Sequence, residues 1–243
     1  MKFYIIISLL LYGLFSFSQG DVQEGSRKFN SNERSFGISF VSNGIGANYK
    51  IGRRIDGTKK LLFDFDFGWF RHPKEIKIKS YDSGNKFVYG KLNVPYNIRA
   101  SIGRQKVIFE KLDNGSVSIQ YFVLASIGGV ILKPIYYSVI TENGLVEQKF
   151  DITEIHSFSQ IYNRSSFFKG VDEITFVPSL SIKAGFDFDF AKKDDRIHAI
   201  DAGFVFDAYL TEVPIMATEK NQQFIFTVFV TYRFGKTTET RLN

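Results

Sequence analysis

The sequence predicts an all-β fold, an up-and-down antiparallel transmembrane β-barrel of about eight strands. Three observations predict it: an apolar N-terminal segment of the secretory kind, alternating apolar and polar residues, and connections of alternating length. Hydrophobic residues make up 44% and charged residues 23% of the 243 residues, which excludes a disordered polymer. No later apolar run reaches the roughly 20 residues of a membrane-spanning helix.

The first residues have the pattern of a secretory signal peptide. Lys2 supplies the positive charge, residues 3–17 form the apolar region, and Ser-Phe-Ser at 16–18 forms a small-x-small cleavage site. A membrane anchor is the alternative, but the apolar region is shorter than the roughly 20 residues that a spanning helix needs. The predicted organisation is a signal peptide at 1–18, a periplasmic tail at 19–34, the barrel at 35–235 and a C-terminal tail at 236–243.

Alternation predicts the individual strands. The first two flank the turn at residues 42–44, whose Asn-Gly is a strong hairpin signal. In the third strand, Asp64 and Asp66 share one face and five large apolar side chains share the other. The fourth strand changes phase near residues 104–106, which indicates a bulge. The eight predicted strands cover residues 35–41, 45–53, 61–70, 96–109, 117–131, 179–190, 197–210 and 223–234.

The connections between these strands alternate in length after the first. Short periplasmic turns and long extracellular loops are typical of outer-membrane barrels. The short connections cover residues 54–59, 113–116 and 191–195. The long ones cover residues 71–95, 132–170 and 211–222. A ten-stranded barrel is the alternative if residues 86–92 pair as well.

Alternation alone is consistent with two opposite arrangements. A soluble periplasmic lipocalin-like carrier would turn its Phe side chains inward, whereas a membrane barrel turns Phe toward lipid and Asp toward the lumen. The apolar faces are long enough for the roughly 9–11 residues of a spanning strand. Aromatic residues also gather near the strand ends, as in interfacial girdles. We therefore predict a membrane barrel.

The polar faces of the strands predict a charge network inside the barrel. A gated ion path is one interpretation, and a packed, salt-bridged interior is the other, since buried charges must be paired. We favour the packed interior, because eight strands enclose only enough space for side chains to fill. The predicted lumen charges are Asp64, Asp66, Arg99, Lys183, Asp187, Asp189, Asp201, Asp207 and Arg233.

Two long connections are candidate contact surfaces. The basic segment 71–91 is either a lipid A contact, because clustered cations attract phosphates, or a solvated loop. The segment 132–170 is aromatic-rich, so we expect it to be ordered and either to dock a partner or to seal the barrel mouth. The candidate lipid A contacts are Arg71, Lys74, Lys77 and Lys79, and the candidate partner contacts are Tyr136, Tyr137, Tyr162, Phe167 and Phe168.

Enzymatic chemistry has little support in the sequence. Cysteine is absent and there are 3 histidines, which excludes disulfides and thiolate metal sites. No nucleophile motif is present, so we expect no catalytic residue, metal or cofactor. A lipid A-modifying enzyme that uses His72 with Glu75, or His156 with Ser157 and Glu154, is the alternative. The signal peptide disfavours nucleic acid as a partner, despite the net charge of +6.

The last strand, FIFTVFVTYRFGK, resembles the closing strand of outer-membrane barrels. Its Tyr232-x-Phe234 is similar to the aromatic pattern that the outer-membrane insertion machinery recognises, although residues 236–243 follow it. Together with HPKE at 72–75, YGKLN at 89–93 and KPIYY at 133–137, it makes the chain resemble small outer-membrane β-barrel proteins of Bacteroidota type, a largely uncharacterised family.

This resemblance implies a location in the outer membrane of a Gram-negative cell after signal-peptide cleavage. It implies outer-membrane lipid, lipopolysaccharide and the insertion machinery as partners. The expected function is a structural or interaction role in the cell envelope, as a subunit of an assembly or secretion complex. No catalytic residue is implied.

Overall fold

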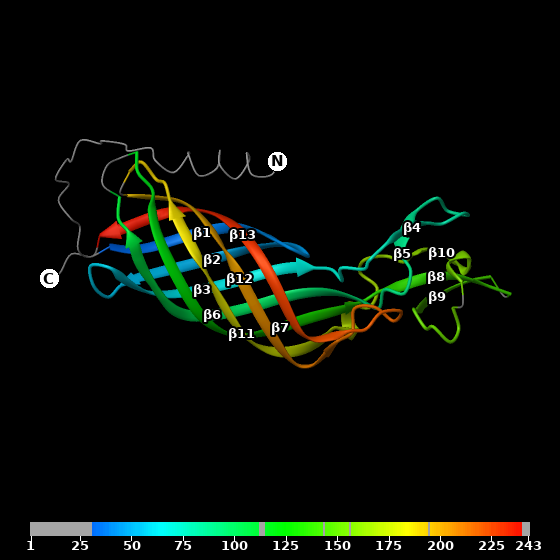
Figure 1. Cartoon of the computed structure of the whole chain (residues 1–243). Coiled ribbons are helices and arrows are strands. Elements are labelled where there is room, and N and C mark those ends of the chain that lie inside the picture. The colour runs from blue at the N-terminus through cyan, green and yellow to red at the C-terminus, as the bar shows by residue number, and fades with distance from the viewer. Residues whose placement is uncertain (1–30, 112–114, 143, 156, 194, 240–243) are drawn as a thin grey trace, which may run out of the picture.

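A computed structural model describes residues 31–111, 115–142, 144–155, 157–193 and 195–239 (Figure 1). The fold is all-β, and its main body is a closed antiparallel barrel with the strand order β1-β13-β12-β11-β7-β6-β3-β2, which confirms the predicted fold class. The eight strands are β1 Ser31–Val41, β2 Gly44–Arg54, β3 Lys59–Phe70, β6 Asn93–Phe109, β7 Ser118–Pro134, β11 Thr175–Asp189, β12 Arg196–Val213 and β13 Gln222–Glu239. Among the described residues, no helix is long and apolar enough to cross a membrane.

The barrel extends beyond the predicted bounds of 35–235. β1 pairs with β13 over its whole length, so Glu33 lies opposite Thr237 and Arg34 opposite Lys236. These residues show no apolar alternation, so the sequence pattern did not include them in the strands. They pair because a closed sheet loses its edges only when the first and last strands share their backbone hydrogen bonds. The predicted tails are therefore shorter at both ends. The signal peptide and residues 19–30 lie outside the described residues.

The predicted rhythm of connections is largely confirmed. β1 and β2 join at the predicted hairpin turn, and the β2–β3, β6–β7 and β11–β12 turns lie at the barrel end that carries both ends of the described chain (Figure 1). The third long connection is shorter than predicted, residues 214–221, because β12 continues to Val213. The bulge of β6 lies at residues 107–109, just beyond the predicted position.

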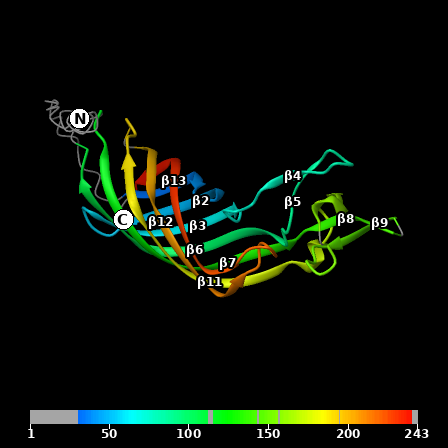
Figure 2. The same cartoon turned by 45° about the vertical axis from the view of Figure 1, so that its right-hand side comes forward.

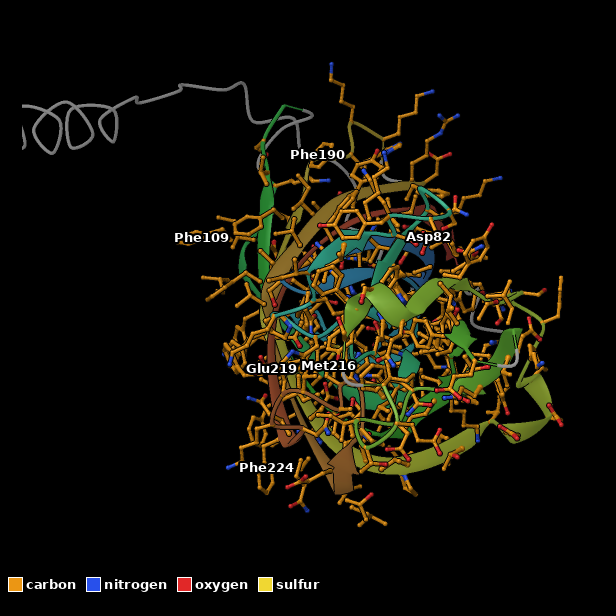
Figure 3. All side chains as sticks on the ribbon, turned by 90° about the vertical axis from the view of Figure 1, so that its right-hand side faces the viewer. Asp82, Phe109, Phe190, Met216, Glu219 and Phe224 are labelled. Carbon is orange, nitrogen blue, oxygen red and sulfur yellow. The ribbon has the colours of Figure 1, made fainter. Side chains whose placement is uncertain are left out.

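The barrel turns its apolar residues outward. In β3, the Asp64 side chain is 0% exposed, whereas the neighbouring Phe65 is 50% exposed. The same arrangement recurs on the other strands, where Phe and Ile project outward and Ser, Asn, Lys and Asp are buried. Viewed from the end opposite the termini, Phe109 and Phe224 point away from the barrel, as Figure 3 shows. The Phe faces are therefore the outer surface.

The long connections fold into a separate structure at the barrel end opposite the termini, which we call the head (residues 71–92, 135–174 and 214–221). It contains a three-stranded sheet in the order β10-β8-β9 and a two-stranded hairpin, β4–β5 (Figures 1 and 2). Since β5 pairs only with β4, residues 86–92 add no strand to the barrel, which has eight strands and not ten. The elements are β4 Lys77–Lys79, β5 Lys86–Val88, β8 Tyr136–Thr141, β9 Gly144–Lys149, β10 Ile161–Arg164 and the 3₁₀ turns η2 Phe158–Gln160 and η3 Val171–Glu173.

The head has an apolar core of its own. Tyr89 and Phe150 meet edge to face with ring centroids 5.0 Å apart. The connection between β12 and β13 binds the head through its backbone, since Ala217 N donates to Gly90 O at 2.7 Å. The buried core residues are Phe87, Ile135, Tyr137, Val139, Phe150, Ile155 and Ile161, and Val94 of β6 packs among them.

Candidate functional site

The lumen contains a dense network of charged side chains. The Lys183 ammonium lies 2.7 Å from Asp64 Oδ2 and 2.8 Å from Asp66 Oδ1. Arg233 donates from Nε to Asp201 Oδ1 at 2.9 Å and also pairs with Asp187. These side chains come from β3, β11, β12 and β13, so the network connects strands that are far apart in sequence.

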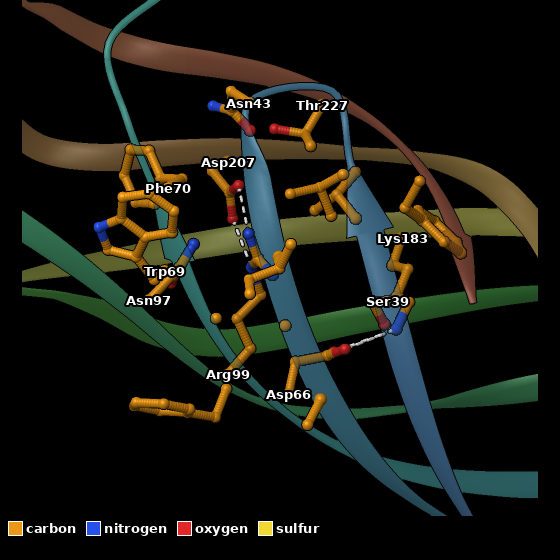
Figure 4. Close-up of a pocket in the computed structure, with 18 of the residues that line it drawn as sticks. Ser39, Asn43, Asp66, Trp69, Phe70, Asn97, Arg99, Lys183, Asp207 and Thr227 are labelled. Carbon is orange, nitrogen blue, oxygen red and sulfur yellow. Dashed lines mark hydrogen bonds and ion pairs between the residues drawn. The ribbon is translucent and has the colours of Figure 1, made fainter. Parts of the chain in front are cut away.

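A second group lies closer to the mouth of the barrel (Figure 4). Arg99 holds Asp207 in a two-pronged ion pair, with Nε to Oδ1 at 2.8 Å and Nη2 to Oδ2 at 2.7 Å. The Ser181 hydroxyl donates to the same carboxylate at 2.6 Å. Asn97, two residues nearer the head than Arg99 on β6, donates to the Tyr209 hydroxyl at 3.1 Å. Each of these buried charges has a partner of opposite sign, which is the condition for keeping it in a low-dielectric interior.

Eight of the nine predicted lumen charges take part in these pairs, and one does not. Asp189 ends β11 near the opposite end of the barrel, where it pairs with Lys111 at 3.1 Å and is partly exposed. The sequence analysis missed Lys50, which lies 2.5 Å from Asp201 Oδ2 and is buried. Lys50 and Asn48 lie two residues apart on the inward face of β2. The alternation of this strand could therefore have identified Lys50 as a lumen residue.

The described interior is packed above and below the charges. Leu62, Phe122, Leu124, Val205 and Phe229 form an apolar cluster within the lumen. A second cluster closes the mouth and includes Val130, Leu132, Tyr209, Val213, Ile215 and Met216. Between them the described residues leave a cavity of about 50 Å³, lined by Gly46, Gly68, Asn97 and Arg99 among others. This arrangement favours the packed interior over an ion path.

The five candidate partner contacts differ in their exposure. Tyr137 is 1% exposed and donates its hydroxyl to Val88 O at 2.8 Å and Lys91 O at 3.0 Å, so its prediction as a contact residue is wrong. It faces the head core because neighbouring strand residues alternate between the two faces. Tyr136 donates to Glu173 at 2.9 Å. Tyr162, Phe167 and Phe168 are exposed, so they remain available for contact.

The candidate lipid A contacts do not form one cluster. Arg71 directly follows β3 at the barrel rim, and Lys74 pairs with Glu219 at 2.7 Å. Lys77 and Lys79 lie on the exposed face of β4, and Lys86 lies directly opposite Lys79 on β5. Like charges placed opposite one another weaken a hairpin. The three lysines of this hairpin form a basic face, and the pairing of Lys79 with Lys86 does not stabilise the hairpin.

The head also contains a buried ion pair between Lys91 and Glu75. Lys91 Nζ lies 2.7 Å from Glu75 Oε1, and both side chains are buried. Burial lowers the pKa of the Lys91 ammonium, and the hydrogen bond to Glu75 opposes that shift. The pair ties the start of the first long connection to its end.

The proposed catalytic alternative gains no support from the geometry. His72 is almost fully buried in a turn, where its backbone N donates to Glu75 Oε1 at 3.0 Å and its Nδ1 accepts from Lys74 N at 3.3 Å. His156 lies outside the described residues. In the described part of the chain, no group of three His, Asp or Glu side chains is placed to hold a metal ion.

Comparison with known proteins found likenesses in structure alone. No protein-family model and no curated protein sequence matches the chain. Ail, the attachment invasion locus protein of Yersinia pestis, is 12% identical with a TM-score of 0.38, covering 86% of this chain and 99% of its own. Neisserial surface protein A is 10% identical with a TM-score of 0.37, covering 89% and 100%. The N-terminal β-barrel domain of Pseudomonas aeruginosa OprF is 11% identical with a TM-score of 0.34, covering 84% and 98%.

Proposed function

We propose that this chain is an integral outer-membrane barrel that carries the head outside the cell as a contact module of the envelope. One observation carries the proposal: the barrel exposes its Phe and Ile side chains and buries its Lys, Arg and Asp side chains. Such a surface is stable against hydrocarbon and unstable against water. A soluble carrier would need the reverse arrangement and an apolar ligand cavity inside the barrel.

The orientation follows from the connections. Outer-membrane barrels keep short turns in the periplasm and long loops outside. Both ends of the described chain and the three short turns lie at one end of the barrel, and the head lies at the other (Figure 1). The proposal includes secretion by a cleaved signal peptide, recognition of Tyr232 and Phe234 by the insertion machinery, and an origin in Bacteroidota-type bacteria.

The head supports an interaction role more than a catalytic one. It is built on its own core and presents exposed aromatic side chains, including Tyr81 and Phe158, whose ring centroids lie 6.1 Å apart. Aromatic residues are enriched at protein contacts. The basic face of β4 and β5 suits the phosphates of lipopolysaccharide. The protein thus acts by contact, as a subunit of an envelope assembly or secretion complex.

The location can be tested by fractionation. The mature protein should stay in the outer membrane after a carbonate wash, and unboiled samples should migrate differently from boiled ones on a gel. The orientation can be tested with single cysteines, because the natural chain has none. A membrane-impermeant maleimide should label Tyr81→Cys in intact cells but label Asp56→Cys, in the β2–β3 turn, only after lysis. Release by carbonate, or the reverse labelling pattern, contradicts the proposal.

The contact role needs a separate test. A photo-crosslinker at position 81, whose ring lies against Phe158, should give one discrete adduct in cells. Deletion of residues 136–164 should remove the adduct without removing the heat shift of the barrel. A crosslinker at position 56 is the matched control and should give no such adduct. An adduct that persists without the head contradicts the assignment of contact to the head.

A further inference from the structure

We propose that Phe167 and Phe168 form a membrane-interface anchor that holds the base of the head against the lipid surface. This inference rests on the proposed membrane location of the barrel. Phe167 is 51% exposed and Phe168 is 80% exposed. Their rings meet edge to face with centroids 5.8 Å apart, so they present one combined apolar surface. Nothing in the head core uses either ring.

The alternation of β7 places this pair on the outer wall of the barrel. Tyr121, Val123 and Ile127 point outward from β7 and are exposed, and Lys133 has the same parity. Lys133 is nevertheless buried, and its ammonium lies 4.8 Å from the centroid of the Phe167 ring. The ring therefore covers an outward-facing position at the rim, on the side that faces lipid.

Lys133 also fixes the segment that carries the two rings. Its Nζ donates to Lys169 O at 3.0 Å and to Pro134 O at 3.3 Å, so the ammonium stays hydrogen-bonded under the ring. Membrane interfaces favour a cation next to apolar surface. At the rim of the barrel, Lys133 provides the cation and the two phenylalanines provide the apolar surface. The cation and the rings together match a lipid headgroup boundary.

The anchor is continuous with the apolar belt of the barrel. Val171, Ile174 and Phe176 are exposed between Phe168 and the outward face of β11. The Phe176 ring lies over the backbone of Gly129 on β7, where a Cβ would come within 2.6 Å of the ring. Exposed apolar side chains thus extend from the belt to Phe168, with the exposed acids Asp172 and Glu173 on the same segment. A protein partner at Phe168 would have to contact the lipid-facing belt as well, which is why the occupant we assign is lipid.

Spin labels on single cysteines test the anchor directly. The full mature protein carrying Phe168→Cys is labelled with a nitroxide, reconstituted in phosphatidylcholine vesicles, and its collision rates with oxygen and a water-soluble nickel chelate are compared. Oxygen concentrates in lipid and the chelate stays in water. Tyr81→Cys, an equally exposed aromatic position in the head, is the water control, and Phe204→Cys in the belt is the lipid control.

The expected oxygen-to-nickel ratio at 168 lies above the ratio at 81 and below the ratio at 204. A ratio at 168 equal to that at 81, with a high ratio at 204, overturns the anchor and leaves the membrane barrel intact. Equal ratios at all three positions overturn the membrane location and the anchor with it. A label at 168 that neither reagent reaches shows protein contact, such as a second copy, and overturns the lipid assignment.

A second label position, residue 171, does not itself replace either phenylalanine. In Val171→Cys, the oxygen-to-nickel ratio should fall when Phe167 and Phe168 are both changed to Ser, because the segment then leaves the lipid surface. The heat shift of the barrel should be unchanged in this variant, since neither ring contacts the lumen. An unchanged ratio at 171 overturns the anchor, whatever the first label shows.

Discussion

In the barrel, Phe and Ile point outward and Lys, Arg and Asp point inward, whereas the head packs apolar side chains into a buried core. Both regions are β-structure with the same two-residue period, so the backbone does not cause the difference. The surroundings do. The head is stabilised by removing apolar surface from water. In the membrane location that we propose, the barrel is stabilised by leaving apolar surface for lipid while pairing its charges inside.

The comparison also shows where each region is vulnerable. A lumen charge depends on partners from distant strands, so one substitution leaves several buried groups unpaired. A head core residue depends on local neighbours, so its loss stays local. The same substitution should therefore have different consequences in the two regions.

The largest effect is expected from Arg233→Met. This change leaves Asp187 and Asp201 without their guanidinium partner in the lumen, and breaking a buried ion pair from one side costs about 3–5 kcal/mol. Urea unfolding in lipid vesicles measures the loss of free energy. Arg34→Met, on the exposed face of β1, is the matched control and should change stability little. Equal effects at both positions contradict a charge-stabilised interior.

A lysine placed on the lipid face should have the next largest effect. Phe204→Lys puts a charge on the outer face of β12, which costs about 2–4 kcal/mol near the membrane midplane. Ile76→Lys in the head exposes its charge to water and should stay within about 0.5 kcal/mol. The same vesicle unfolding experiment compares the two variants. If both are neutral, the outer face of the barrel does not meet hydrocarbon.

Ile161→Ala tests whether the head can be disrupted alone. The side chain is fully buried in the head core, and such truncations cost about 2 kcal/mol or more. Protease treatment of intact vesicles should cleave the variant within the head faster than the unchanged protein. The gel shift between boiled and unboiled samples should stay the same. A loss of the gel shift would show that the head and the barrel unfold as one unit.

The smallest effect is a pH dependence of the head. The Lys149 ammonium lies 2.6 Å from Glu173, and its hydrogen bond together with that of the Tyr136 hydroxyl lowers the Glu173 pKa below its ordinary value of 4.5. A lowered folded-state pKa stabilises the head above the ordinary value, and this contribution is lost as the pH falls through the folded-state value. The protection factors of the amides in β8 and β9, which correct for the intrinsic pH dependence of exchange, should therefore fall in acid, and Glu173→Gln should reduce that dependence.

Most of the barrel could be predicted because its strands are long and strictly alternating. Asp64, Asp187 and Asp207 share inward faces with other polar residues over many positions, so their location inside followed from the two-residue period. The two-residue period did not show which face points outward, because a membrane barrel and a soluble barrel have the same alternation of apolar and polar residues. The choice depended on the length of the apolar faces and on the aromatic residues near the strand ends.

The head could not be predicted in the same way. Its strands, such as Lys77–Lys79, are too short for alternation to be recognised, and their pairing depends on contacts between connections far apart in sequence. Tyr136 and Tyr137 are adjacent, so only the position of β8 determines which ring is buried. Lys133 was missed as well, because its role depends on the Phe167 ring that covers it.

Refolding tests the central claim, that the outer face of the barrel is built for lipid, most directly. The mature chain is unfolded in urea and diluted either into buffer or into phosphatidylcholine vesicles, and gel migration without boiling reports the closed barrel. The account predicts that the closed barrel forms with vesicles, while the chain aggregates in buffer. A stable, closed monomer formed in buffer without lipid would contradict it.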